Sequence, residues 1–336
     1  MNKTSSLAHK VVDVARSSYD SVVLQPPAVG LNSWQNELLL FIKPEMFMVE
    51  EPQKPIDLVL SKLDEYKVQI SGVAIIGGRV LEQTEIMNRH YGYINLLSRS
   101  ASTVLTTQDI RAIEDVFGLA PASYRILGGH EYLKEHPDQT NADLDSMWFS
   151  EKSTKIKSGF YVRSVRQGND QLVLVNAFHP AQLAHFTESA HRIALFLVHS
   201  DTPWSELRND MVGTTFPEKA NPTSIRGSLH AQAQEYGFRE VTVANNGVHL
   251  SAGPFEAMFE ITNFFGNLTG MSIVEQPPLV LRRMLEAEID EIKAKAALDN
   301  PPINYNGSTT NLFSATEDMN TDDAIALYKQ ALGYSG

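Results

Sequence analysis

Two separated stretches of the chain repeat one alternation of short apolar runs and amphipathic segments, and this alternation limits the possible folds more than any other feature. In the first stretch, the apolar run NELLLFI (36–42) is stopped by Lys43-Pro44, which indicates a buried strand followed by a loop. The elements predicted in this stretch are strand 36–42, helix 55–67, strand 68–81 and helix 84–98. Strands that alternate with helices in this way indicate an α/β or α+β layer.

The second stretch resumes this pattern after an insertion, and the chain is therefore expected to have several parts. The elements predicted there are helix 180–189, strand 193–198, a Gly/Pro/Thr-rich loop 213–228, strand 239–243 and helix 254–265. The parts predicted are an N-terminal arm (1–34), one domain formed by 35–98 and 178–276, an inserted lobe (99–177) and a helical C-terminal extension (277–336). In the extension, a charged helix over 279–298 and a last helix that begins near Thr321 are predicted.

The inserted lobe differs in character from the domain on either side of it. It is expected to hold a helix at 107–117, a polar stretch at 137–145 without periodicity, and a hairpin of 160–165 and 171–175 around a turn at 167–170. Basic residues gather between 151 and 166, namely Lys152, Lys155, Lys157, Arg163 and Arg166. They are interpreted as protection of an exposed strand edge, or as a basic arm for an acidic partner.

Composition excludes several classes of function. The 336 residues carry 28 Lys plus Arg against 40 Asp plus Glu, a net charge of −12, so nucleic acid is not an expected partner. Nucleotides remain possible because they need only a few cations. The chain has no cysteine, which excludes disulfides, thiolate catalysis and Cys-ligated metals. No run approaches the ~18 apolar residues of a membrane span, and no signal peptide is apparent, so a cytoplasmic protein without a membrane partner is expected.

Two familiar kinds of site are not predicted. The sequence has no Walker A loop and no GxGxxG motif, so a P-loop is not how phosphates would be held. His130 and His136 lie six positions apart, as do His179, His185 and His191. On a helix this spacing places imidazoles on different faces, so no metal ligands are predicted in the protein itself.

A histidine and a glutamate supply the most suggestive chemistry. His249 follows a predicted strand, and Glu260 lies on the helix begun by Gly253-Pro254, on a flank from which it can reach back to the imidazole. A carboxylate bound to one ring nitrogen fixes the tautomer and leaves the other nitrogen as a nucleophile. Lys43, at the end of a predicted strand, offers a cation. The loop NPTSIRG (221–227) offers a further cation and hydrogen-bond donors.

The order of six motifs resembles the nucleoside diphosphate kinase family. These motifs are FIKPE, RHY, LRNDMVGTT, NPTSIRG, NNGVHLS and FEAMFE, and they lie within 35–98 and 178–266. The resemblance implies an α+β fold, in which a ferredoxin-like antiparallel sheet is covered by helices, with the inserted α+β lobe added. By matching motifs, it implies catalytic roles for His249, Glu260 and Lys43, and nucleotide or phosphate binding by Lys43, Tyr91, Phe178, Arg208, Thr215, Arg226, Asn246 and Ser251.

The resemblance also implies a reaction. His249 would take the γ-phosphate of a nucleoside triphosphate as a phosphohistidine and pass it to a nucleoside diphosphate. Mg²⁺ would be held through the nucleotide phosphates rather than by protein ligands, and a homo-oligomer, a dimer or larger, is expected. Three residues depart from the family pattern: Glu45 stands in place of Asp, Leu250 in place of Gly, and Ala252 in place of an acidic residue.

Two other functions are compatible with the same residues. A nucleotide-sensing or scaffolding module would keep the fold without turnover, as the insertion and the terminal extensions favour. A phosphotransferase with a different acceptor would use the insertion to recognise something other than a diphosphate.

Overall fold

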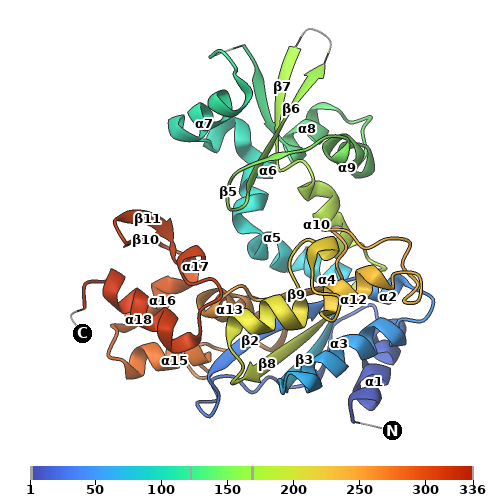
Figure 1. Ribbon diagram of the computed structural model, residues 1–336, viewed down its shortest axis with the longest axis vertical. Coiled ribbons are helices and arrows are strands. Elements are labelled where there is room, and N and C mark those ends of the chain that lie inside the picture. Colours follow the sequence, from blue (N-terminus) through green and yellow to red (C-terminus); the bar gives the residue numbers. More distant parts are fainter. Residues whose placement is uncertain (1–2, 122, 168–169, 335–336) are drawn as a thin grey trace. The chain divides into compact units, whose positions relative to one another are not determined.

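The computed structural model describes residues 3–121, 123–167 and 170–334, which form two compact units (Figure 1). Unit 1 consists of Met1–Ile86 and Glu188–Gly336, and unit 2 of Met87–Thr187. Unit 2 is wider at both ends than the predicted insertion, 99–177. The predicted turn at 167–170 includes residues 168–169, which lie outside the described residues. Among the described residues, no helix has both the length and the apolar character needed to cross a membrane.

Five strands of unit 1 form an antiparallel sheet in the order β1-β3-β8-β2-β9, and β10 (Pro302–Tyr305) and β11 (Ser308–Asn311) of the C-terminal extension pair separately. The five strands are β1 (Val22–Gln25), β2 (Asn36–Ile42), β3 (Gln69–Gly77), β8 (Arg192–Ser200) and β9 (Val248–Leu250). Every residue of β2 and β8 is buried, because both strands are central and covered. Strand β1 pairs with β3, so the segment predicted as an N-terminal arm instead extends the sheet.

Helices of unit 1 cover this sheet, and α1 and α3 pack against each other (Figure 1). Outside the C-terminal extension, the α-helices of unit 1 are α1 (Lys3–Ser17), α2 (Glu45–Met48), α3 (Gln53–Glu65), α4 (Gly78–Gln83), α11 (Trp204–Glu206), α12 (Ile225–Ala231), α13 (Pro254–Ile261) and α14 (Asn267–Thr269). Two π-helical segments, η1 (Leu207–Val212) and η3 (Thr262–Gly266), and the 3₁₀ turn η2 (Pro217–Lys219) complete the set.

The C-terminal extension packs against α13. It contains α15 (Leu279–Glu286), α16 (Glu291–Ala296), η4 (Ala297–Asp299), β10 (Pro302–Tyr305), β11 (Ser308–Asn311), α17 (Leu312–Ala315) and α18 (Thr321–Ala331). Phe255 and Met258 of α13 share a buried cluster with Met284 and Tyr328 of the extension. The extension therefore supports the helix that carries Glu260.

Three predictions for unit 1 are wrong. The strand predicted over 68–81 ends at Gly77, because the chain turns into α4 at Gly78. The segment 239–243 is not a strand, because β9 occupies the sheet edge beside β2 and the β-branched residues there find no strand to pair with. The helix predicted over 279–298 is broken, because Glu288 adopts φ +60° and Asp290 caps a new helix by accepting from the Ile292 and Lys293 amides.

A buried polar network joins the sheet to two distant segments. His199 of β8 contacts the Ser71 hydroxyl through Nδ1 (2.8 Å) and the Glu37 carboxylate through Nε2 (3.0 Å). Glu37 also accepts from the amides of Gly30 (2.5 Å) and Leu279 (2.7 Å). The network thus fixes the start of the C-terminal extension to the central strands.

Unit 2 has a mixed sheet in the order β4-β7-β6-β5, in which β4 and β7 are parallel. Its strands are β4 (Arg125–Gly128), β5 (Thr154–Lys157), β6 (Phe160–Gln167) and β7 (Asp170–Val175). Its helices are α5 (Ile86–His90, which begins at the unit boundary), α6 (Gly92–Val104), α7 (Thr107–Phe117), α8 (Gly129–Glu135), α9 (Asn141–Phe149) and α10 (His179–Thr187). Helix 84–98 is thus two helices, and the polar stretch 137–145 contains the start of α9.

Two of the basic residues between 151 and 166 serve contacts within unit 2. Lys157, on the edge strand β5, donates to Asp109 at 2.6 Å. Arg163 is buried on β6 and donates to the Ser150 hydroxyl at 3.0 Å. These two side chains are therefore part of the structure of the lobe.

Candidate active site

His249 lies at the centre of β9, where the sheet fixes its ring. Its register partner on β2 is Phe41, and the two rings stack with centroids 4.6 Å apart and 20° between their planes. The flanking Val248 and Leu250 are buried, while 21% of the His249 side chain remains exposed. The imidazole is therefore held on one side by an aromatic ring and still reaches solvent.

Glu260 orients this imidazole. Its Oε1 lies 2.6 Å from His249 Nε2, and its Oε2 accepts from the Ser251 hydroxyl at 2.5 Å. Ser251 is in turn fixed to β2, because its Oγ accepts from the Leu39 amide at 3.0 Å. The Glu260 side chain is fully buried rather than on a helix flank. The three residues thus form a hydrogen-bonded chain from the sheet through α13 to the imidazole.

The environment keeps His249 neutral. Burial lowers its pKa well below the usual 6.5, and the charges of Lys43, Arg226 and Arg208 lower that pKa further. A neutral imidazole that donates Nε2–H to Glu260 carries its lone pair on Nδ1. The arrangement can therefore present Nδ1 as a nucleophile at neutral pH.

A second carboxyl group lies one helical turn before Glu260. Burial, followed by the negative charge of Glu260, raises the pKa of Glu256 well above its usual range. Its Oε2 accepts from the Ala252 amide at 3.0 Å. At neutral pH the proton therefore belongs to Glu256, and the negative charge belongs to Glu260 beside the imidazole.

Lys43 and Asn246 form a buried pair next to β9. Lys43 Nζ donates to Asn246 Oδ1 at 2.7 Å and to the Ala244 carbonyl at 3.2 Å. Burial lowers the pKa of Lys43 to about 8, Arg226 lowers it as well, and Glu45 opposes them. The lysine is thus poised to lose its proton in mildly alkaline solution.

Glu45, one of the departures from the family pattern, supports the turn before β9. Its Oε1 accepts from the Gly247 amide at 2.9 Å. Gly247 has φ +83°, and a Cβ there would lie 2.6 Å from Leu229 Cδ1 and 2.9 Å from Met46 Sδ. The turn that directs the chain into β9 therefore requires glycine.

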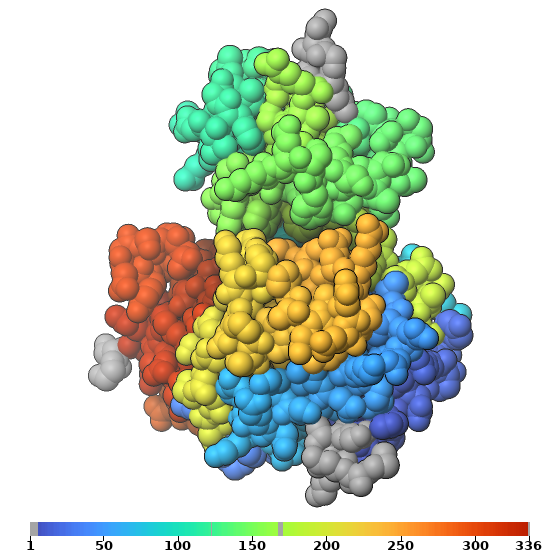
Figure 2. Space-filling view, turned by 45° about the vertical axis from the view of Figure 1, so that its right-hand side comes forward, coloured from blue at the N-terminus to red at the C-terminus, as the bar shows by residue number. Residues whose placement is uncertain are grey.

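Arg226 joins three segments beside His249. From α12, its Nη1 donates to the Gly213 carbonyl at 2.9 Å and its Nη2 to the Val248 carbonyl at 3.0 Å. The exposed Thr215 accepts from Asn246 Nδ2 through its carbonyl at 3.3 Å. Figure 2 shows this part of the chain, in yellow to orange, on the surface of unit 1 beside the blue segment that includes α3.

Arg208 has partners that the sequence did not indicate. Its Nη1 donates to Glu317 and to Asp318, both at 2.8 Å, and to the Ala252 carbonyl at 3.3 Å. Burial lowers the pKa of Arg208, but the two carboxylates outweigh burial and raise that pKa overall. The predicted phosphate ligand is therefore bound to the C-terminal extension in this structure.

The other two predicted nucleotide ligands belong to unit 2. Tyr91 packs edge-on against His90, with ring centroids 4.5 Å apart, and against His179 at 5.7 Å. Phe178 contacts Trp148 at 5.8 Å and Tyr161 at 5.9 Å. Both rings are thus packed within unit 2, and their contact with a nucleotide stays a prediction.

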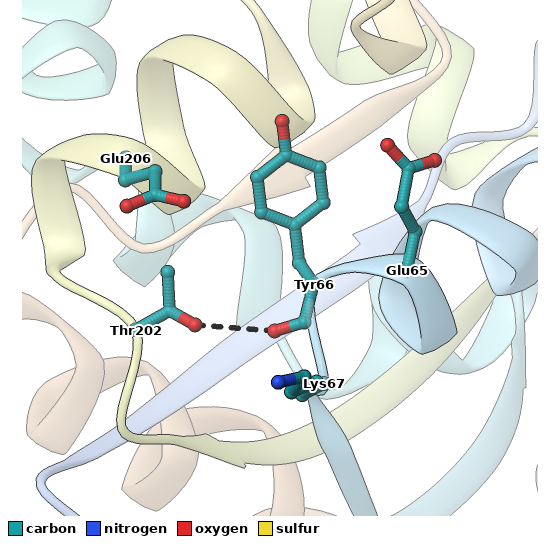
Figure 3. A pocket seen from close by; sticks show the side chains of 5 residues that line it. All are labelled: Glu65, Tyr66, Lys67, Thr202 and Glu206. Atoms are coloured by element: carbon teal, nitrogen blue, oxygen red, sulfur yellow. Dashed lines mark hydrogen bonds between the residues drawn. The ribbon is translucent and has the colours of Figure 1, made fainter.

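A pocket elsewhere in unit 1 is a poor place for phosphates. It has a volume of about 320 Å³ and is lined by Glu65, Tyr66, Lys67, Thr202 and Glu206 (Figure 3). The Thr202 hydroxyl donates to the Tyr66 carbonyl at 3.1 Å there. Burial raises the pKa of the Tyr66 phenol, and the charges of Asp210, Glu65 and Glu206 raise it further. These carboxylates disfavour binding of an anion such as phosphate. None of the predicted site residues lines the pocket.

Sequence reasoning missed four contributors to the site. Phe41 could have been found, because it lies two residues before Lys43 on a strand predicted at its observed bounds. Glu256 could have been suspected from its place one turn before Glu260. Glu317 and Asp318 gave no signal, because they are more than 100 residues from Arg208.

Comparisons with known proteins give only remote structural likenesses. No family model and no curated protein matches the sequence. One similar solved structure is a transition-state mimic of nucleoside-diphosphate kinase from Borrelia burgdorferi with bound vanadate and ADP. The two sequences are 15% identical, the match covers 68% of this chain and 86% of that chain, and the TM-score is 0.33. Another is an NDP kinase from Pyrobaculum aerophilum, which is 17% identical over 68% of this chain and 94% of that chain, with a TM-score of 0.33. Any assignment of function therefore depends on the chain's own residues.

Proposed function

We propose that this protein is a phosphotransferase that moves the γ-phosphate of a nucleoside triphosphate to a nucleoside diphosphate through a phosphohistidine at His249. The observation that carries the proposal is the hydrogen-bonded chain from Ser251 through Glu260 to His249 Nε2. A buried carboxylate in this position fixes the tautomer and stabilises the charge that the imidazole gains when its other nitrogen is phosphorylated.

The proposed step is an in-line displacement. A bond forms between His249 Nδ1 and the γ-phosphorus while the bond from that phosphorus to the β–γ bridging oxygen breaks. The electron pair of the broken bond leaves with the nucleoside diphosphate. A terminal oxygen of a second diphosphate then attacks the phosphorus, and the electrons of the N–P bond return to Nδ1. Nε2 keeps its proton throughout, facing the charge of Glu260.

Positive charge beside His249 suits this reaction. Phosphoryl transfer depends on positioning and on stabilisation of charge spread over the phosphate oxygens. Lys43, Arg226 and Arg208 supply cations whose fields reach the imidazole. In the proposal they bind the phosphates with Thr215, while Asn246 and Lys43 address the ribose.

The finer fold assignment is part of the proposal. The order β3-β8-β2-β9, with all neighbours antiparallel, supports a ferredoxin-like arrangement to which β1 is added. A homo-oligomer is expected with it, and light scattering on the purified protein measures that state.

Magnesium would enter with the nucleotide. The carboxyl groups described beside His249 already have partners: Glu260 binds His249 and Ser251, Glu256 accepts from the Ala252 amide, and Glu45 accepts from the Gly247 amide. This fits an ion carried by the phosphates rather than by a protein cage. When bound, Mg²⁺ would offset phosphate charge.

The direct test is incubation with ATP labelled at the γ-phosphate. The expected product is a protein-bound label that is lost in acid and retained in base. His249→Gln should abolish the label, whereas His230→Gln, a histidine exposed on α12, should keep it. Labelling of the His249→Gln variant would refute the assignment.

A chase of the labelled protein separates the proposal from its alternatives. Release of the label to ADP and GDP is expected. A label that forms but is not released by either diphosphate indicates another acceptor. Nucleotide binding without any label indicates a sensor.

A further inference from the structure

The C-terminal extension touches the segment that follows His249. Its loop between α17 and α18 lies against Ala252 and Gly253: the Asp318 amide donates to the Ala252 carbonyl at 2.9 Å. A Cβ on Gly253 would lie 2.6 Å from the Thr316 carbonyl oxygen, so this approach leaves no space for a side chain. Backbone contacts therefore hold the loop beside the site.

From this loop, two carboxylates bind one guanidinium. Glu317 and Asp318 both accept from Arg208 Nη1 at 2.8 Å. The Arg208 side chain is 23% exposed, against 51% for Glu317 and 39% for Asp318. Because both carboxylates reach solvent, they can release the guanidinium by side-chain rotation, with no movement of the loop.

The ion pairs lie within electrostatic range of the reacting groups. The charge of Arg208 contributes to the lowered pKa of His249, and that of Glu317 to the raised pKa of Glu256. A phosphate that binds Arg208 must therefore compete with carboxylates that are part of the chain. Carboxylate and phosphate oxygens use the same guanidinium donors.

We propose that Glu317 and Asp318 set the affinity of the site by competing with nucleotide phosphates for Arg208. This inference rests on the proposed function, in which Arg208 is a phosphate ligand. The competition weakens binding of nucleoside di- and triphosphates and leaves binding of an uncharged nucleoside unchanged. It also makes nucleotide affinity depend on a part of the chain to which the family resemblance does not extend.

The test is the affinity of the full-length protein for ADP and for adenosine, measured by calorimetry. Glu317→Gln with Asp318→Asn should tighten ADP binding on the order of tenfold, because exposed ion pairs of this kind are weak individually but both are released here. Adenosine binding should not change. The gain should shrink as salt rises.

A matched control exists on the same extension. Glu291 pairs with Lys295 at 2.6 Å and Asp322 with Arg283 at 2.8 Å. Glu291→Gln with Asp322→Asn removes the same charge and should leave ADP affinity unchanged. An equal gain in this control, or none in the Glu317/Asp318 variant, overturns the inference.

Two further measurements separate the possible failures. In an Arg208→Gln background the Glu317/Asp318 substitutions should have less than about a twofold effect, since the shared partner is gone. A full gain of ADP affinity in that background shows that the carboxylates repel the nucleotide without involving Arg208, and overturns the inference. Phosphohistidine labelling of the wild-type protein tests the proposed function independently: a labelled protein with no affinity change refutes this inference alone, and an unlabelled protein that binds no ADP refutes both.

Discussion

Replacement of Glu260 by glutamine tests the step on which the proposed chemistry depends. Glutamine has the same shape, so its carbonyl oxygen can still accept from His249 Nε2 and its amide can face Ser251. What is lost is the negative charge, in a position where the side chain is fully buried and little water can replace it. The substitution therefore removes the electrostatic effect and keeps the contact.

The expected loss of rate follows from the strength of the hydrogen bond to His249 with a charged and with a neutral acceptor. A bond to a charged group contributes ~1.5–3 kcal/mol, against ~0.5–1.5 kcal/mol for a neutral one. The loss at His249 is then ~1–2 kcal/mol in the transition state, or a rate lower by about five- to thirtyfold. The affinity for ADP should stay within about twofold, because Glu260 contacts the imidazole rather than the nucleotide.

The assay is rapid-quench measurement of phosphohistidine formation from γ-labelled ATP, with calorimetry for ADP. Glu256→Gln is the matched control, because it makes the same change one turn earlier on α13, where the carboxyl group is already protonated at neutral pH. It should leave the rate within about twofold. An unchanged rate in Glu260→Gln, or an equal loss in both variants, would refute the reasoning.

The same environment predicts three further results. ADP affinity should fall as pH rises through about 8, because Lys43 loses its proton there, and Lys43→Arg should bind equally at pH 7 and pH 9. At saturating ATP, labelling of His249 should stay constant from pH 7 to pH 6.5 and decline only at lower pH, because the lowered pKa of His249 keeps its neutral form populated in that window. Glu37→Gln should lower the free energy of unfolding in urea by ~1–3 kcal/mol, because one amide facing the buried carboxylate loses its acceptor.

Local sequence signals predicted part of the fold accurately. Strand β2 has the predicted bounds, because an unbroken apolar run ends at a lysine and a proline. Helix α7 also has the predicted bounds, 107–117, since Thr106 and Asp109 form a capping box at its start and Gly118 ends it at φ +64°. In both cases the residues that define the ends are neighbours in sequence.

Other elements depended on tertiary contacts or on a signal that was overlooked. Helix α9 begins with the same kind of capping box, formed by Thr140 and Asp143, but its weak periodicity hid it. The residues at 239–243 have strand-like composition, yet strand formation needs a partner, which local sequence does not supply. Strand β1 is missed for the converse reason. Its segment is predicted as an arm, but it forms a strand because the edge of β3 gives it a partner.

The site itself shows the same limit in its two glutamates. The sequence places Glu256 and Glu260 four residues apart on one helix, and nothing local distinguishes their chemistry. Glu260 receives the Ser251 hydroxyl and faces His249 Nε2, whereas Glu256 receives one backbone amide. Two carboxylates this close do not both ionise readily, so the one with more donors keeps the charge. The donors come from β9 and the turn that follows it. The pairing of β9 with β2 therefore determines that Glu260 keeps the negative charge and Glu256 keeps the proton.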